Sequence, residues 1–226
     1  MRPKWNILIV GLAAIVIVLV IVLFSFGGSP HGAGSLSGVE IREYDGQPLS
    51  SVNDFHLNAI SGVQNVNITN YRLTVDGLTN KTMVYSYDDV IANHQNYTKV
   101  VTIHCVEGWD ATILYQGVLV RDLINEAGID PHANTVIFHA TDGYTTSFPL
   151  DYFYSNDIIM AYRMNNITLP AERGYPFDLV AEEKWGYKWI KWINQIELSN
   201  NPEYQGYWEQ RGYSDNGSLS LGYFSD

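Results

Sequence analysis

The chain has 226 residues and carries 24 acidic against 13 basic side chains, a formal net charge of −11. This charge argues against binding to nucleic acid and against adsorption to anionic lipid, because both repel an acidic protein. The single cysteine excludes an internal disulfide, a Cys-x-x-Cys-His haem motif and an iron–sulfur cysteine cluster, so core packing must hold the fold.

The first part of the chain predicts a membrane anchor. Residues 7–26 contain no charged side chain, and a helix of that length spans about 30 Å, the thickness of a bilayer's hydrocarbon core. Arg2 and Lys4 precede this run. The positive-inside rule therefore predicts a single-pass protein of the cell membrane, with its C-terminal domain outside the cytoplasm. A cleaved signal peptide is the alternative, although its apolar core is usually only about 7–15 residues long.

Composition also suggests the boundaries of the remaining segments. Residues 1–28 are predicted to be a cytoplasmic stub with the transmembrane helix, and residues 29–40, rich in Gly and Ser, a flexible tether. Residues 41–214 are expected to form one domain, followed by a polar tail at 215–226.

Short strands and short helices alternate within this domain. Helices are expected at 85–93 and 118–127, the second with an apolar stripe that ends at Gly128. Strands are expected at 71–78, 100–106, 135–140, 158–164 and 190–198. This pattern predicts an α+β domain built on a mixed β-sheet.

Cys105 ends the expected strand 100–106, which Gly108 terminates. Because side chains alternate along a strand, Ile103 and Cys105 should point to one face, and His104 and Val106 to the other. The thiol would then leave the end of a core strand, where proteins place groups that meet a ligand. The alternative is a buried free cysteine, which is a common and inert core residue.

Five short motifs surround this cysteine and follow it along the chain. They are Cys105-Val106-Glu107-x-Trp109, Gln116-Gly117-Val118, Asp142-Gly143-Tyr144, Gly174-x-Pro176 and Trp185-Gly186-Tyr187-Lys188-x-Ile190-Lys191. In order and spacing, over residues 71–213, this series resembles the molybdopterin-binding domain of the sulfite oxidase superfamily. It is most similar to the short prokaryotic members, which include the catalytic subunits of methionine-sulfoxide reductases.

The resemblance implies a reaction and a cofactor. In that family one cysteine thiolate binds molybdenum together with the dithiolene sulfurs of a single pyranopterin, which leaves oxo or water positions for oxygen-atom transfer. Cys105 would thus be the metal ligand and a catalytic residue. A small sulfur or nitrogen oxide would be the substrate, with a neutral sulfoxide or N-oxide favoured over anionic sulfite by the charge of the chain. An external electron carrier, such as a membrane cytochrome, would complete the reaction.

Further site residues follow from the same resemblance. Trp189, Ile190 and Lys191 align with the segment that binds the pterin phosphate through its backbone and a lysine, and Lys188 and Arg173 would add positive charge.

Three more polar residues are implied on the pterin and substrate side. Asn58 matches an upstream asparagine that contacts the pterin. Thr141 and Tyr144 would line the same cavity, and Tyr144 is assigned a catalytic role.

Two features depart from the family pattern. The related reductases carry an Asn-Gly-x-Pro-x-Arg segment whose Asn and Arg contact the cofactor, and here Arg173 and Asp178 occupy these two positions. A carboxylate repels a phosphate unless it is protonated or turned away. In addition, the first five residues contain no twin arginine for export of a folded, loaded domain.

These departures leave other hypotheses open. One is a binding or scaffold domain that keeps the fold without the cofactor. Another makes Cys105 a nucleophile with His139 as its base, since His104 should face away from the thiol.

Overall fold

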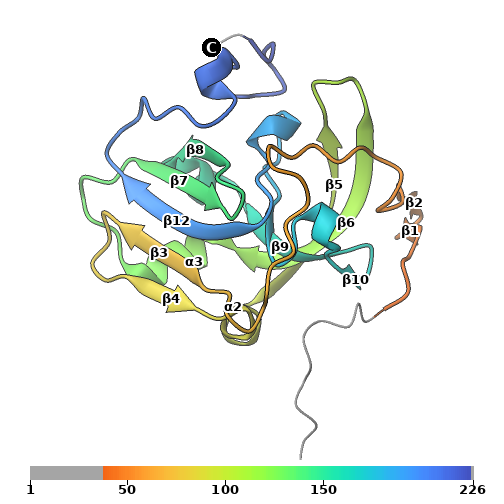
Figure 1. Ribbon diagram of the computed structural model, residues 1–226, viewed down its shortest axis with the longest axis horizontal. Helices are drawn as coiled ribbons and strands as arrows, with labels where there is room; N and C mark the ends of the chain where they lie inside the picture. Colours follow the sequence, from red (N-terminus) through yellow and green to blue (C-terminus); the bar gives the residue numbers. More distant parts are fainter. Residues whose placement is uncertain (1–37, 225–226) are drawn as a thin grey trace, which may run out of the picture. The chain divides into compact units, whose positions relative to one another are not determined.

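Two five-stranded β-sheets carry the fold in the computed structural model, which describes residues 38–224 (Figure 1). The first sheet has the order β10-β9-β6-β5, with β11 also paired to β9, and all its pairings are antiparallel. Its strands are β5 (Asn96–His104), β6 (Asp110–Leu119), β9 (Ile159–Met164), β10 (Ile167–Thr168) and β11 (Asp178–Leu179).

The second sheet has the order β4-β3-β12-β7-β8. It is mixed, because β12 pairs in parallel with β3 while the other neighbours are antiparallel. Its strands are β3 (Leu73–Gly77), β4 (Met83–Tyr85), β7 (Thr135–Ala140), β8 (Thr145–Pro149) and β12 (Ile193–Ser199). A small ribbon of β1 (Glu43–Tyr44) and β2 (Gln47–Pro48) precedes both sheets.

Short helices connect the strands. They are α2 (Tyr87–Asn93), α3 (Val120–Ala127) and α4 (Leu150–Ser155), with single 3₁₀ turns at η1 (Ala171–Arg173), η2 (Gly186–Lys188) and η3 (Glu209–Arg211). A capping box between Ser86 and Asp89 starts α2. In α3 the buried residues Val120, Leu123, Ile124 and Ala127 follow the helical period, so this face packs on the core. The α+β class with a mixed sheet is therefore confirmed.

The predicted elements differ from the observed ones mainly around β6. The sequence pattern gave no strand at 110–119 and placed Val118 and Leu119 in a helix, whereas α3 starts only at Val120. The burial of β6 explains this, because most of its residues are buried on both faces and no polar–apolar alternation remains. The predicted strand 190–198 likewise begins three residues later, at Ile193.

The predicted tether and tail boundaries also differ from the structure. Glu40 already belongs to the domain, because its carboxylate accepts hydrogen bonds from the backbone of Val52 (2.8 Å) and the amide of Asn165 (3.2 Å). Beyond residue 214, Tyr223 packs edge-on against Trp185, and its carbonyl accepts from the Ser214 N–H (2.9 Å). Residues 215–224 are thus part of the folded domain, since their aromatic side chains find partners on it.

Within the part of the chain that the structure describes, there is no helix of the length and apolarity needed to cross a bilayer. The membrane span predicted at 7–26 lies outside the described residues.

Candidate functional site

Cys105 stands at the turn between the two longest strands of the first sheet. Strand β5 ends at His104, and the chain reverses between Cys105 and Trp109, whose carbonyl accepts from the Cys105 N–H (2.9 Å). Gly108 completes this turn with a φ of +88°, a value that favours glycine. Cys105 therefore lies just after strand β5, whereas the sequence pattern placed it within the strand.

The thiol is buried next to two polar side chains. The residue is 7% exposed, with Asn58 Nδ2 3.6 Å and Glu107 Oε2 4.0 Å from its sulfur. Burial raises the pKa of Cys105, and the hydrogen bond from Asn58 opposes this shift. Asn58 thus lies beside the sulfur of Cys105, and the pterin contact assigned to it from the resemblance stays a prediction.

Cys105 opens onto a cavity of about 530 Å³, a volume in the usual range of cofactor and ligand sites. Ten aromatic side chains line the cavity, and charged groups lie among them. The aromatic residues are Phe55, Trp109, Tyr115, Tyr144, Tyr187, Trp189, Trp192, Tyr207, Trp208 and Tyr213. The charged or titratable residues besides Cys105 are His56, Glu107, Asp142, Arg173, Asp178 and Lys191.

Six of the predicted site residues line this cavity and three do not. Those that line it are Asn58, Cys105, Tyr144, Arg173, Trp189 and Lys191. Thr141 instead donates its hydroxyl hydrogen to the carbonyl of Trp192 (3.1 Å). Ile190 is fully buried in the core, and its carbonyl accepts from the N–H of Leu179 (3.0 Å).

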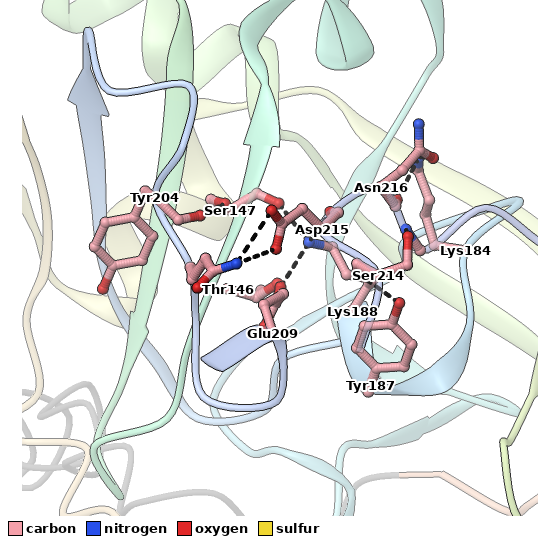
Figure 2. A network of polar contacts seen from close by, with 12 residues as sticks. Thr146, Ser147, Lys184, Tyr187, Lys188, Tyr204, Glu209, Ser214, Asp215 and Asn216 are labelled. Atoms are coloured by element: carbon pink, nitrogen blue, oxygen red, sulfur yellow. Dashed lines mark hydrogen bonds and ion pairs between the residues drawn. The ribbon is translucent and has the colours of Figure 1, made fainter. Parts of the chain in front are cut away.

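Lys188 has a different environment from the one predicted. Its ammonium group is fully buried, 2.7 Å from Glu209 Oε1, and it also donates to the carbonyls of Ser147 (2.7 Å) and Asp215 (2.9 Å). Figure 2 shows Lys188 at the centre of this polar network, between the β8 strand and the C-terminal segment. Lys188 therefore binds protein groups and is not among the residues that line the cavity.

Arg173 and Lys191 line the cavity and bind the loop at residues 52–58. Each of the three guanidinium nitrogens of Arg173 donates to a backbone carbonyl of this loop, those of Val52 (2.7 Å), Phe55 (2.7 Å) and His56 (3.3 Å). Lys191 donates to the carbonyl of Asn58. The two cations thus hold the loop that brings the Asn58 amide to the Cys105 sulfur.

Tyr144 lines the cavity with its hydroxyl already bound. The hydroxyl donates to the carbonyl of Tyr187, and burial raises its pKa well above the ordinary value. Its proton is therefore held by the backbone in this structure. The catalytic role assigned to Tyr144 stays a prediction.

Neither histidine considered as a base for a nucleophilic cysteine reaches Cys105. His104 is paired with Asp110 (2.8 Å), and His139 with Glu197 (2.8 Å). Neither is among the residues that line the cavity. A cysteine nucleophile needs a base within hydrogen-bonding reach, and the structure provides none of the proposed ones.

The fold and this cavity define a cofactor-binding oxidoreductase domain. A family model for the oxidoreductase molybdopterin binding domain matches residues 60–208, so the chain belongs to that family. The resemblance inferred from the five motifs is confirmed, and the chain is a molybdenum-dependent oxidoreductase by family.

Several characterised and uncharacterised proteins are similar to this chain. The uncharacterized oxidoreductase YuiH of Bacillus subtilis is 35% identical over 65% of this chain and 73% of its own length. A putative protein-methionine-sulfoxide reductase subunit, YedZ1 of Azospira oryzae, is 33% identical over 71% of this chain and 62% of its own. The catalytic subunit MsrP of a protein-methionine-sulfoxide reductase from Gluconobacter oxydans is 27% identical, over 57% and 46% respectively.

A solved structure shows the same fold. The sulfane dehydrogenase SoxCD from Paracoccus pantotrophus matches with a TM-score of 0.61 over 84% of this chain and 59% of that chain. Sequence identity in this match is 20%, so it supports the sulfite-oxidase-type fold alone.

The residues present fit a molybdenum–pterin cofactor. The cavity is large enough for a tricyclic pterin, and a thiol stands at its edge. No cluster of three or more His, Cys, Asp or Glu side chains that could hold a metal occurs among residues 38–224. A single thiolate suffices only where the cofactor itself supplies the other ligands.

Sequence reasoning missed several residues of this cavity. The sequence pattern placed Glu107 and Trp109 in a motif but gave them no role at the site. In the structure, the Trp109 indole donates to Glu107 Oε2 (3.1 Å) beside the thiol. Tyr207, Trp208 and Tyr213 come from the C-terminal segment. Their aromatic spacing was the one available signal, and it does not distinguish a cavity wall from a core.

Proposed function

We propose that this chain transfers an oxygen atom from a small neutral sulfoxide or N-oxide, using a molybdenum bound by Cys105. The observation that carries the proposal is the position of Cys105 in the wall of a cavity of about 530 Å³ that ten aromatic side chains help to line. A thiolate is a soft ligand suited to molybdenum. Aromatic walls suit a substrate with apolar substituents.

The cofactor, when bound, supplies the two-electron chemistry of oxygen-atom transfer. Reduction of a sulfoxide consumes two electrons and two protons, breaks the S–O bond and gives a thioether and water. The electrons come from an external carrier. The chain's own residues would bind and orient. Cys105 would hold the metal, and Asn58 donates to its sulfur. Arg173 and Lys191 hold the 52–58 loop, which contributes residues 55–58 to the cavity wall.

Charge around the cavity supports a neutral substrate. Arg173 and Lys191 bind loop carbonyls, and the carboxylates of Glu107 and Asp142 also line the cavity. An anion such as sulfite would meet these carboxylates in a chain of net charge −11. The similar reductases act, by their names, on methionine sulfoxide in proteins.

Location and electron supply complete the proposal. The uncharged run at 7–26 would anchor the chain as a single-pass membrane protein with this domain outside the cytoplasm. A membrane cytochrome or a small carrier would then deliver electrons. Fractionation of cells, followed by protease treatment of intact spheroplasts, tests this. Recovery in the soluble cytoplasmic fraction would contradict it.

The decisive test is metal and activity analysis of natively produced protein. Wild-type chain should contain about one molybdenum per molecule and reduce dimethyl sulfoxide with a reduced viologen dye as donor. Cys105→Ser should fold normally, because only weak contacts reach the thiol, and should lose turnover. Metal-free, inactive wild-type protein would instead support the cofactor-free binding domain.

A further inference from the structure

Asp178 has a fixed position in the wall of the cavity. It begins β11, where Asp178 pairs with Ala161 of β9 on one side and bridges to Lys191 on the other. The next residue, Leu179, donates its N–H to the carbonyl of Ile190 (3.0 Å). Backbone pairing on both sides thus keeps the Asp178 side chain at the cavity, which it lines while only 8% exposed.

One carboxyl oxygen of Asp178 lacks a hydrogen-bond partner, although the backbone N–H of Leu179 reaches the carboxyl group and lowers its pKa slightly. This oxygen, Oδ1, is buried and has no partner anywhere in residues 38–224. The hydrogen bonds of the two nearby cations go elsewhere: Arg173 donates to Val52, Phe55 and His56, and Lys191 donates to Asn58. Burial raises the pKa of Asp178, and the charges of Lys191 and Arg173 only partly oppose this.

A buried carboxyl oxygen without a hydrogen-bond partner destabilises the protein when no ligand is bound. Leaving such a group unsatisfied costs about 1–3 kcal/mol, and more when it is charged. Buried polar groups are nearly always paired, so an orphan in a ligand cavity indicates that a ligand provides the partner. Asp178 is therefore a candidate group for recognising a ligand of this cavity.

We propose that Asp178 recognises the N–H donors of the pterin ring system of the cofactor. This inference rests on the proposed function. The pterin carries an amino group and a ring N–H side by side, and a carboxylate accepts such a donor pair in the way that Asp and Glu accept the amino group of a nucleobase. The phosphate of the cofactor offers no N–H donor, and it would repel Asp178 in the ionised form.

The experiment compares cofactor retention and apo-protein stability in three variants. Asp178→Asn removes the charge at constant shape, and Asp178→Leu removes all hydrogen bonding. Asp76→Asn is the matched control, since Asp76 lies on β3 of the other sheet and binds Gln195 (2.8 Å). Molybdenum is measured by elemental analysis, and pterin by the fluorescence of its released, oxidised form.

Wild-type and Asp76→Asn proteins should hold equal amounts of molybdenum and pterin. Both Asp178 variants should hold about tenfold less, the effect of about 1.4 kcal/mol in binding. At the same time, the cofactor-free Asp178→Leu protein should melt at or above the wild-type temperature, because the unpaired group is gone. A purely structural role for Asp178 would instead lower the melting temperature.

Two results would overturn the role of Asp178, and a third would overturn the proposed function instead. If both Asp178 variants keep wild-type amounts of molybdenum and pterin, the carboxyl does not bind the cofactor. If they keep more, the group faces the phosphate instead. If wild-type protein itself contains neither molybdenum nor pterin, the proposed function fails, which the wild-type measurement alone reveals.

Discussion

Lys188 and Glu209 form an ion pair of 2.7 Å in which neither side chain is exposed. Lys188 ends η2, and Glu209 begins η3 in the C-terminal segment. Glu209 also accepts from the hydroxyl of Thr146 on β8 (2.8 Å). Figure 2 shows these groups converging between the strand and the segment. The pair therefore fastens the C-terminal segment, whose Tyr207 and Trp208 line the cavity.

Removing one partner of this pair should destabilise the domain strongly. Lys188→Met leaves the Glu209 carboxylate buried and uncompensated, which costs about 3–5 kcal/mol in the free energy of unfolding. Urea denaturation of purified protein measures this. Lys184→Met is the control, because the Lys184 ammonium donates to Asn216 at the surface (2.9 and 3.0 Å) and lies 5.2 Å from the Tyr152 ring centroid, so its loss should cost less than about 1 kcal/mol.

A double variant separates the pair from simple packing loss. Lys188→Met combined with Glu209→Leu removes both charges, so it should be more stable than Lys188→Met alone. The single variant Glu209→Leu completes the comparison. If the double variant loses as much unfolding free energy as the two single variants together, the ion pair does not explain the effect of Lys188→Met.

The sequence predicted the surroundings of Cys105 better than those of Lys188, and the reason is physical. The strands at 135–140 and 158–164 are short apolar runs with clear turn signals, and they appear as β7 and β9 almost unchanged. Cys105 and Asn58 were assigned through resemblance, and the structure brings them together across 47 positions of chain.

The environment of Lys188 could not be predicted from the residues next to it in the sequence. Its partner Glu209 lies 21 residues away in a stretch without periodicity, so only the fold reveals that the lysine is neutralised by protein. The same applies to Asp178. The sequence marks it as an unusual residue at its position, but its unpaired oxygen depends on where Arg173 and Lys191 direct their donors.

Arg173 should be irreplaceable by lysine. Its planar guanidinium reaches the carbonyls of Val52, Phe55 and His56 and stacks 3.8 Å from the Phe55 ring centroid. A lysine ammonium cannot span three carbonyls in this fork geometry. Arg173→Lys should therefore cost about 1.5–3 kcal/mol and loosen the 52–58 loop.

Hydrogen exchange detects that loosening directly. The backbone amides of residues 52–58 should exchange faster in Arg173→Lys than in wild type, while those of β7 and β12 should exchange as before. Arg121→Lys is the matched control, because Arg121 pairs with Asp157 (2.6 Å), which lies outside this loop. Unchanged exchange in the loop would show that Arg173 does not hold it.

Asp178 should make the stability of the cofactor-free protein fall as pH rises. Burial raises the pKa of Asp178 to about 8 against the opposing charges of Lys191 and Arg173. Two titratable groups lie beside it: Tyr115, whose pKa burial raises, and Lys191, whose pKa burial lowers to about 8. The folded state thus binds more protons than the unfolded state between about pH 4 and the raised value. The free energy of unfolding therefore decreases with pH across that window.

Asp178→Asn removes this proton uptake. The difference in unfolding free energy between variant and wild type should grow steadily from about pH 5 to about pH 7.5. Urea titrations of the two cofactor-free proteins at matched pH values measure it, with Asp76→Asn as control. A difference that stays constant over this range would mean that Asp178 is ionised throughout.

Charge on the substrate should decide which sulfoxides are reduced well. Two sulfoxides of similar size, one neutral and one bearing a carboxylate, share the reaction and the electron donor, so their ratio of kcat/KM isolates the effect of charge. Glu107 and Asp142 line the cavity, and the chain has a net charge of −11. At low salt the neutral compound should be preferred by about tenfold, and the ratio should shrink as salt screens the field. A preference for the anionic sulfoxide at low salt would instead mean that Arg173 or Lys191 turns from the loop to bind the substrate, and the neutral-substrate proposal would have to be abandoned.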